Sequence, residues 1–385
     1  MKITRFDTTI VNVPYRHQEV SSRLIRSGVS IVIVKLTADN GLGGWGESCN
    51  SANAAVFEAA LETARPFLIG RDPWQGKAIA RDFYKLAEWD EREPTGNYVF
   101  AGIDMALWDL CGKACGQPLY RLFGGALRRT VDYFYYLERG SPDAIAAQGR
   151  DGAARGYGVY YLKVGIDAAA ETAMLEALRA TVGREARIRV DANGAWSVNE
   201  AVKRLVAWDR DFGLDFCEDP VLLEPPANMR DVRQRVPVAL SANVVMQREL
   251  DVLRLIRERC ADYLCFSPYF VGTINRFMAL SHVADLDGIK VCKHTNGELG
   301  IAAAAFQHVM LAVPNACEGN QQTASVMAGD ILKQRLPIAD GPAWGVIEAP
   351  GIGVEVDEDR IAEYHEAYRR DGQYLPYRLD PADRA

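Results

Sequence analysis

The sequence predicts an α/β fold in which a (β/α) barrel follows a smaller α+β domain. Over about 200 residues from Val131, short apolar runs alternate with amphipathic segments of helical period, as in parallel strands joined by helices. The preceding part has strands first and helices afterwards, without that alternation. The length of 385 residues suits one large domain and one smaller one.

The N-terminal part predicts a small antiparallel sheet followed by helices. Two segments alternate apolar and polar residues up to glycine-rich turns, KITRFDTTIVNVPY and VSIVIVKLTADNGLGGWGE. From Ala54 the pattern has helical period, in AAVFEAALETARPFL, WQGKAIARDFYKLAEW and VFAGIDMALWDLCGKACG. We assign residues 1–128 to this α+β domain.

The barrel is predicted over residues 129–348. The expected strands are VDYFYYLE, VYYLKVGI, RIRVDAN, LDFCED, VALSAN, ADYLCFS, IKVCKH and NACEG. Amphipathic helices such as DAAAETAMLEALRAT and NEAVKRLVAWDR lie between them. The segment 349–385 is expected to pack back on the first domain.

Composition and charge favour a small-molecule partner. The chain is 49% hydrophobic and 25% charged, with a net charge of -7 and no basic stripe, which argues against nucleic acid and anionic membranes. Neither a signal peptide nor about 18 uninterrupted apolar residues occurs, so we expect a cytoplasmic protein. The eight cysteines lie mostly in apolar runs, and CGKAC lacks zinc-site spacing, so reduced core thiols are expected.

Polar side chains end the predicted barrel strands at regular intervals. Reactive groups of such barrels lie at the carboxyl ends of the strands. Successive residues of this kind are 24 to 28 positions apart, which is about the length of one strand and one helix. They are Lys163, Asp191, Glu218, Asn243, Ser267, His294 and Glu318. The spacing predicts one ring of side chains around one cavity.

Three adjacent members of the ring suit a hard divalent cation. The carboxylates of Asp191 and Glu218 and the amide oxygen of Asn243 are ligands that Mg²⁺ accepts while keeping positions open for substrate. The alternative is that Asp191 caps a loop, Glu218 pairs with a nearby cation and Asn243 is a turn residue.

Lys163 and His294 lie opposite each other in the ring. Lys163 is inside the apolar run VYYLKVG, where desolvation should lower its pKa and make a neutral amine available as a base. Two bases facing each other could remove or return a proton on either face of a bound substrate. The alternatives are an ion-paired lysine and a structural histidine.

Several motifs together resemble the enolase superfamily, in the branch of mandelate racemases, muconate lactonizing enzymes and acid-sugar dehydratases. They are GLGGWGES, ALWDLCGKACGQPLYRLFGG, YLKVG, VDANGAWS, EDP and GIGVEV, in the family's order along nearly the whole chain. The resemblance implies a capping domain with a modified (β/α)7β TIM-type barrel. It also implies Mg²⁺, or Mn²⁺, at Asp191, Glu218 and a third-strand partner, and a homo-oligomer. The implied chemistry is abstraction of the proton alpha to a carboxylate, which gives a metal-stabilised enolate.

The sequence departs from the family pattern around the base and the metal site. The family's K-x-K is Tyr161-Leu162-Lys163 here, so Lys163 depends on desolvation and the metal, and Tyr161 becomes a candidate proton donor. Ala242 stands where racemases place a ligand acid, and Asn243 follows it, as in glucarate dehydratases, which use an amide ligand.

The pattern around the histidine also differs. Ser267 replaces the family's aspartate partner, which makes His294 a weaker base and a better proton donor. The neighbouring Lys293 is expected to point away, because adjacent strand residues alternate faces. Glu318 matches the racemases' acid that binds the substrate carboxylate. Other candidate substrate-binding residues are Tyr15, Arg16 and Arg26 in the segment 15–30, Ser48, Asn50 and Ser267.

Our leading hypothesis is a Mg²⁺-dependent dehydratase of a hydroxy acid similar to a sugar acid. Lys163 would take the alpha proton, the metal and Glu318 would hold the enolate, and His294 or Tyr161 would protonate the departing hydroxyl. One alternative is a racemase, epimerase or cycloisomerase that uses Lys163 and His294 as opposed bases. Another is a non-catalytic, metal-binding regulatory protein, which Tyr161, Ala242 and Ser267 allow.

Overall fold

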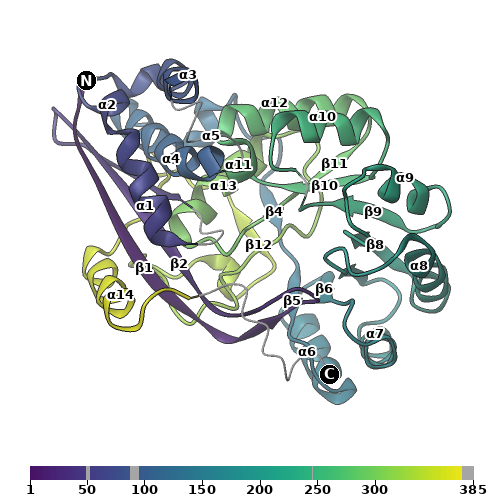
Figure 1. The fold of residues 1–385 in the computed structure, drawn as a ribbon. Helices are drawn as coiled ribbons and strands as arrows, with labels where there is room; N and C mark the ends of the chain where they lie inside the picture. Colours follow the sequence, from purple (N-terminus) through teal and green to yellow (C-terminus); the bar gives the residue numbers. More distant parts are fainter. Residues whose placement is uncertain (49–52, 87–94, 245, 375–385) are drawn as a thin grey trace.

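The N-terminal domain is a three-stranded antiparallel sheet covered by helices. The computed structural model describes residues 1–48, 53–86, 95–244 and 246–374. The sheet has the order β1 (Ile3–Val20), β2 (Ile25–Ala38) and β3 (Gly43–Ser48). Its helices are α1 (Ala54–Thr63), α2 (Arg65–Leu68), α3 (Gly76–Leu86), α4 (Thr95–Cys115) and α5 (Leu119–Leu122), with a 3-10 turn at Pro73–Gln75. Figure 1 shows α1 lying along the sheet.

The second domain is a barrel with seven parallel strands in sequence order. They are β5 (Tyr135–Leu137), β6 (Val159–Lys163), β7 (Arg187–Asp191), β8 (Leu214–Glu218), β9 (Ala239–Ala242), β10 (Tyr263–Phe266) and β11 (Lys290–Lys293). The segment 316–320 bridges the two edges, because Ala316 pairs with Val291 and Asn320 with Tyr133. The predicted fold class, a TIM-type barrel with a capping domain, is confirmed.

Helices connect the strands and cover the outside of the barrel. They are α6 (Pro142–Ala154), α7 (Ala168–Val182), α8 (Val198–Phe212), α9 (Ala227–Arg233), α10 (Glu249–Arg257), α11 (Pro268–Val271), α12 (Ile274–Leu286) and α13 (Gly300–Ala312). The short strands β4 (Thr130–Asp132) and β12 (Ala343–Gly345) pair with each other, with a 3-10 turn at Pro337–Ala339 before β12. The last helix, α14 (Glu358–Asp371), packs against β1. The domain limits 128 and 348 stay predictions.

Two further expectations concern composition. Among the described residues, no helix is long and apolar enough to cross a membrane. The described cysteines form no disulfide, and six of them are buried as predicted, whereas Cys115 is exposed near the end of α4.

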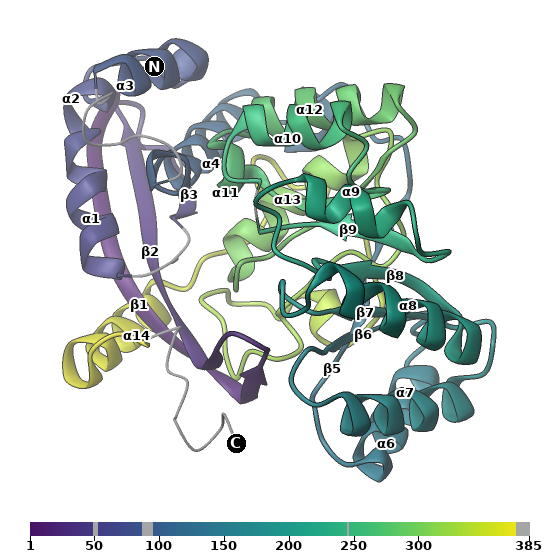
Figure 2. The ribbon, with the colours of Figure 1, turned by 45° about the vertical axis from the view of Figure 1, so that its right-hand side comes forward.

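The hairpin of β1 and β2 reaches from the capping sheet to the barrel. At its turn, the Ser22 hydroxyl donates a hydrogen bond to the carbonyl of Ala192, directly after β7, at 2.7 Å. Figure 2 shows this hairpin next to the barrel strands β5 and β6. The capping domain therefore places residues of the segment 15–30 beside the carboxyl ends of the barrel strands.

Glu47, in the GLGGWGES motif, joins the two domains. This fully buried residue of β3 accepts hydrogen bonds from the backbone N–H groups of Leu299 and Ala302, at 2.8 and 2.9 Å. These groups belong to the N-cap residue and the first turn of α13, where N–H groups have no partner within the helix. Burial raises the pKa of Glu47 to about 8, against two backbone hydrogen bonds that lower it.

This raised pKa predicts a pH dependence of stability. The folded chain holds a proton on Glu47 that the unfolded chain releases above 4.5, so stability should fall as pH rises from 4.5 to about 8. Glu47→Gln removes the ionisable group and should flatten that part of the curve. Thermal unfolding of both chains at half-unit pH steps measures the effect. Parallel curves for the two chains would contradict the assignment.

Candidate active site

Lys163, Asp191 and Glu218 end three neighbouring strands of the barrel. Lys163 lies beside Asp191 in the β6–β7 register, and Asp191 lies beside Glu218 in the β7–β8 register. Because parallel strands end at the same edge, the three side chains form one row at the mouth of the barrel. Asp191 and Glu218 are fully buried.

The ammonium of Lys163 is held in this row by hydrogen bonds. It donates to Oδ2 of Asp191 at 2.5 Å and to Oδ1 of Asn193 at 3.3 Å. Asn193, which sequence reasoning missed, also donates to both oxygens of Asp191, from its backbone N–H at 2.8 Å and from its side chain at 3.0 Å. The residue has a positive φ of 49°, a turn that brings it back onto the strand end.

The hydroxyl of Tyr161 is also committed to Asp191. It donates to Oδ2 at 2.7 Å, and its ring stacks on Phe134 with centroids 4.4 Å apart. Burial, followed by the charge of Asp191, raises the pKa of Tyr161 well above 10. The phenol is therefore neutral, and its proton is directed at the carboxylate of Asp191, which it positions.

The expected lowering of the Lys163 pKa is wrong for the chain without a bound cation. Burial lowers the pKa, but the carboxylates of Asp191, Glu19 and Glu218 outweigh it and raise the pKa overall. The prediction considered desolvation and omitted the attraction of nearby carboxylates, one of which comes from the capping domain.

The donor set fits a hard divalent cation that also takes an amide oxygen. Among the described residues, no three His, Cys, Asp or Glu side chains form a group that could hold a metal ion. A site built on Asp191 and Glu218 would therefore also use a neutral oxygen, for which Asn243 is the candidate. The Asn243 nitrogen donates to the carbonyl of Cys265 at 2.6 Å, which leaves its oxygen as the available donor atom. Ser241 lies beside Glu218 in the β8–β9 register. Its hydroxyl is buried without a hydrogen-bond partner among the described residues.

The carboxylates of this site crowd one another. Burial, followed by the charge of Asp191, raises the pKa of Glu218 well above 4.5. The same two causes raise the pKa of Asp219 to about 7, although its oxygens accept the backbone N–H groups of Asn243 and Val244. Such a concentration of buried negative charge favours a bound cation.

His294 follows β11 on the other side of the mouth. Its Nδ1 accepts the backbone N–H of Asn296 at 3.2 Å, and its ring lies 5.3 Å from that of Phe270. Burial, and then the positive charges of Lys163, Arg26 and Lys293, lower the pKa of His294 well below 6.5. A neutral imidazole that accepts at Nδ1 carries its proton on Nε2, so His294 is a hydrogen-bond donor there.

The neighbours expected for His294 were Lys293, pointing away from the site, and Ser267, bound to the imidazole. Lys293 is fully buried and forms an ion pair with Glu298, on the other face of the strand as expected. Ser267 does not bind the imidazole, because its buried hydroxyl has no hydrogen-bond partner among the described residues. His294 therefore lacks the partner expected for it.

The prediction that Glu318 lies at the mouth is wrong. Its carboxylate is exposed and pairs with Arg187, the first residue of β7, at the opposite end of the barrel. The strand end is instead Gln321, whose N–H donates to the carbonyl of Lys293 and whose amide lies 3.4 Å from both oxygens of Glu218. The prediction placed the strand end three residues too early, because this segment lacks a regular strand pattern.

The expected substrate-binding residues of the capping domain have different environments. Tyr15 and Arg16 line a cavity, whereas Arg26 is paired with Glu19 and is not available to a substrate carboxylate in this structure. The prediction for Ser48 is wrong, because its fully buried hydroxyl donates to the carbonyl of Val99 in α4. Asn50 lies outside the described residues.

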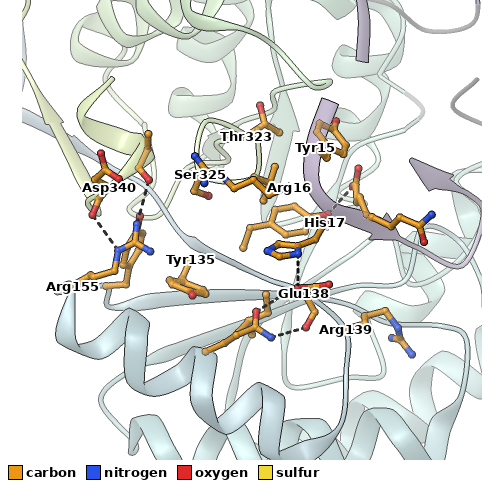
Figure 3. A pocket seen from close by; sticks show the side chains of 18 of the residues that line it. Tyr15, Arg16, His17, Tyr135, Glu138, Arg139, Arg155, Thr323, Ser325 and Asp340 are labelled. Carbon is orange, nitrogen blue, oxygen red and sulfur yellow. Dashed lines mark hydrogen bonds and ion pairs between the residues drawn. The ribbon is translucent and has the colours of Figure 1, made fainter. Parts of the chain in front are cut away.

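Two cavities border the hairpin, and one of them also borders the loops after β7 and β8. One, of about 390 Å³, lies between the hairpin and β5, and Figure 3 shows Tyr15, Arg16 and His17 across from Tyr135 and Glu138. Glu19 and Tyr136 also line it. The second, also of about 390 Å³, is lined by Asn193 and Asp219 and by the apolar residues Val221, Leu222, Leu223 and Val244.

A buried ion pair fixes the loop that follows Lys163. Arg139 donates to the carbonyl of Lys163 at 2.6 Å and to Oε1 of Glu171 at 3.0 Å. The same oxygen accepts the backbone N–H groups of Ile166 and Asp167, at 2.7 and 3.1 Å. Glu171, fully buried in the first turn of α7, therefore holds the end of β6 and the loop after it.

Replacement of this carboxylate should impair the position of Lys163, the candidate base. We expect Glu171→Gln to lower kcat roughly 10-fold with a smaller change in KM, because the displaced group takes part in chemistry more than in binding. Glu176→Gln, at an exposed position of the same helix, is the matched control and should behave like the unchanged chain. Equal kinetics of both variants would remove the positioning role from Glu171.

Comparison with known proteins gives consistent matches over the whole chain. Residues 5–124 match the model of the mandelate racemase / muconate lactonizing enzyme N-terminal domain, and residues 144–360 match that of the enolase C-terminal domain-like family. The chain is 26% identical to an N-succinyl-L-Arg/Lys racemase of Bacillus cereus, over 94% of this chain and 98% of the racemase. It is 29% identical to a D-galactonate dehydratase family member of Streptomyces bingchenggensis, over 90% of this chain and 94% of that protein.

A solved structure matches to the same extent. The crystal structure of an enolase from Thermobispora bispora, complexed with magnesium and formate, superposes with a TM-score of 0.89. The identity is 26%, over 98% of this chain and 96% of that one. The relatives thus include both a lyase and an isomerase on one fold.

Proposed function

Because the chain belongs to the mandelate racemase and muconate lactonizing enzyme branch of the enolase superfamily, we propose that it is a Mg²⁺-dependent dehydratase. The substrate would be a small hydroxy acid similar to a sugar acid. The enzyme would remove the proton alpha to its carboxylate and release the hydroxyl from the neighbouring carbon. Mn²⁺ is the alternative metal ion.

The observation that carries this proposal is the asymmetry between Lys163 and His294. Lys163 lies among carboxylates and can exchange a proton, whereas Nδ1 of His294 accepts a backbone N–H that an imidazolium could not bind. Racemisation by two bases needs both side chains to gain and lose a proton in turn. Dehydration needs one base and one donor, which is the pair that this site offers.

The residues divide the reaction between them. Asp191, Glu218 and Asn243 would hold the cation. When bound, the cation neutralises the carboxylates that raise the pKa of Lys163 and stabilises negative charge that develops on the substrate carboxylate. Lys163 takes the alpha proton as the neutral amine, while Asn193 and Tyr161 keep Asp191 beside it.

His294 acts on the opposite side of the substrate. The Nε2–H group donates to the departing hydroxyl, which leaves as water when it takes a proton. Because a sugar acid also carries a hydroxyl on its alpha carbon, the product is an enol that tautomerises to a 2-keto acid. The dry surroundings of the site strengthen each of these hydrogen bonds. Polar side chains of the first cavity, including Tyr15 and Arg16, would hydrogen-bond the substrate's other hydroxyls.

A library of sugar acids tests the proposal. The chain is incubated with each acid and Mg²⁺, and 2-keto acids are detected by semicarbazide absorbance. We expect at least one acid to give a product, and we expect no product from that acid once EDTA has removed the metal. The absence of product from every acid, or a change of configuration without loss of water, would overturn the proposal.

A further inference from the structure

Asp219 connects the loops that follow three strands of the candidate site. It comes directly after Glu218, it is 1% exposed, and its backbone has a positive φ of 39°. Its backbone N–H donates to the carbonyl of Ser241 at 2.9 Å, and its carbonyl accepts the backbone N–H of Gly194 at 2.7 Å. These two bonds join the loop after β8 to the end of β9 and to the loop after β7. Asp219 has no role in the proposed reaction.

The carboxylate of Asp219 is directed at the backbone of Asn243, the candidate third ligand. Its Oδ1 accepts the N–H of Asn243 at 2.8 Å, and its Oδ2 accepts the N–H of Val244 at 3.0 Å. Hydrogen bonds from N–H groups to a carboxylate are stronger than those between neutral groups. Both oxygens of Asp219 therefore fix the chain directly after the last residue of β9, which is Ala242.

The side chain of Asn243 is fixed by a different strand. Its Nδ2 donates to the carbonyl of Cys265, in β10, at 2.6 Å. Because Asp219 holds the backbone and Cys265 holds the amide nitrogen, the two contacts together set the direction of the remaining atom, Oδ1. An amide depends on such support, because it offers one oxygen and has no net charge that attracts the cation.

Asn193 has a similar relation to the first candidate ligand. It also has a positive φ, and it donates to both oxygens of Asp191 from its backbone N–H and its side chain. At both places a polar residue in the turn after a strand fixes a candidate ligand through two hydrogen bonds. Asn193 acts on its own strand, whereas Asp219 acts on the neighbouring one.

We propose that Asp219 is a positioning residue that holds Asn243 at the cation and so lets an amide oxygen complete the metal site. Its two hydrogen bonds fix the backbone of the ligand. Without them the segment after β9 loses its support, and Oδ1 of Asn243 loses its direction. The inference deepens the proposed function and rests on it for the metal ion and the third ligand.

Calorimetric titration with Mg²⁺ tests the inference without any substrate. Asp219→Asn keeps the size of the side chain, and asparagine tolerates a positive φ, but it offers one oxygen in place of two. We expect the affinity for Mg²⁺ to fall about 10–100-fold, which is the range for partners of metal ligands. Asp231→Asn, the same substitution at an exposed position of α9, is the matched control and should bind Mg²⁺ like the unchanged chain.

A double-mutant cycle with Asn243→Ala separates positioning from charge and from general stability. If Asp219 acts through the amide ligand, Asp219→Asn should cause no further loss of affinity in a chain that already lacks this ligand. A carboxylate that attracts the cation directly, or that only stabilises the fold, would cause its full loss in the Asn243→Ala chain as well. Unchanged affinity in Asp219→Asn, or losses that multiply in the double variant, would overturn the inference.

A second variant and a measurement on the unchanged chain cover the case in which Asp219→Asn does not fold. The hydroxyl of Asp219→Ser can accept one N–H group, so this variant should show a loss of affinity and the same result in the cycle. In the unchanged chain with Mg²⁺ bound, the amide hydrogens of Asn243 and Val244 should exchange slowly with solvent. Rapid exchange at both positions would contradict the role of Asp219.

The outcomes distinguish this inference from the proposed function. If Asn243→Ala binds Mg²⁺ like the unchanged chain while an acid is dehydrated, the inference fails and the proposed function stands. If no acid is dehydrated but the cycle has the expected result, the proposed function fails and the role of Asp219 stands.

Discussion

Replacing Lys163 by Met should lower kcat by about 10²–10⁴-fold for any acid that the enzyme accepts, which is the range for loss of a general base. Lys163 is the basic side chain that lies on the predicted metal ligand Asp191, at 2.5 Å. Methionine keeps most of the length of the side chain. Asp191 would still be held by Tyr161 and Asn193, so the site should stay assembled.

The measurement is steady-state kinetics together with deuterium exchange of the alpha hydrogen in D₂O. Loss of exchange shows that proton abstraction, and no later step, has failed. Lys333→Met is the control, because Lys333 is exposed and pairs with Glu355. If Lys163→Met retains exchange at the unchanged rate, Lys163 is not the base.

Replacing Glu218 by Gln should weaken Mg²⁺ binding by at least about 100-fold, because even the outer partners of metal ligands contribute about 10–100-fold. Glu218 is fully buried, and among the described residues its side chain interacts with the amide of Gln321, at 3.4 Å, and with the thiol of Cys265. The variant would leave Asp191 as the one carboxylate of the proposed set. Calorimetric titration with Mg²⁺ and Mn²⁺ measures the change.

Glu318→Gln provides the matched control for that titration. It removes a carboxylate from the same barrel, but from the opposite end, where Glu318 pairs with Arg187. We expect its metal affinity to equal that of the unchanged chain. A larger loss in Glu318→Gln than in Glu218→Gln would contradict the ligand set.

The alternation of short strands and helices was sufficient to predict the barrel and the order of its strand ends. Lys163, Asp191 and Glu218 end regular strands, so their positions followed from the two-residue period of the strand and the rule for parallel sheets. The prediction for Glu318 failed because the last segment of the barrel pairs with its neighbours only through isolated bridges. Its sequence has no alternating pattern that fixes the register.

Tertiary contacts could not be predicted from local sequence patterns. The Glu19–Arg26 pair forms across a hairpin, and its effect on Lys163 and His294 depends on how the capping domain lies on the barrel. The alternation of strand faces correctly placed Lys293 away from the site, since that argument is local. Ser48 was misassigned because its partner, Val99, lies in a helix that the strand pattern does not locate.

Local turn chemistry left one signal that could have been used. Asn193 follows Asp191 by two residues and precedes Gly194, a pairing typical of a turn with positive φ. Such an asparagine can return its backbone N–H to the acid before it, as the structure has it at 2.8 Å. An asparagine close to a predicted metal ligand in the sequence is therefore a candidate for a residue that positions that ligand.

In the proposed reaction Lys163 alone moves the alpha proton, and His294 donates to a leaving hydroxyl. The most direct measurement is ¹H NMR of the sugar-acid reaction in D₂O with Mg²⁺, with recovered substrate and product examined together. We expect a 2-keto acid, recovered substrate of unchanged configuration, and loss of all alpha-hydrogen exchange in Lys163→Met. Recovered substrate of inverted configuration, deuterated at the alpha carbon and with no keto acid formed, would contradict it.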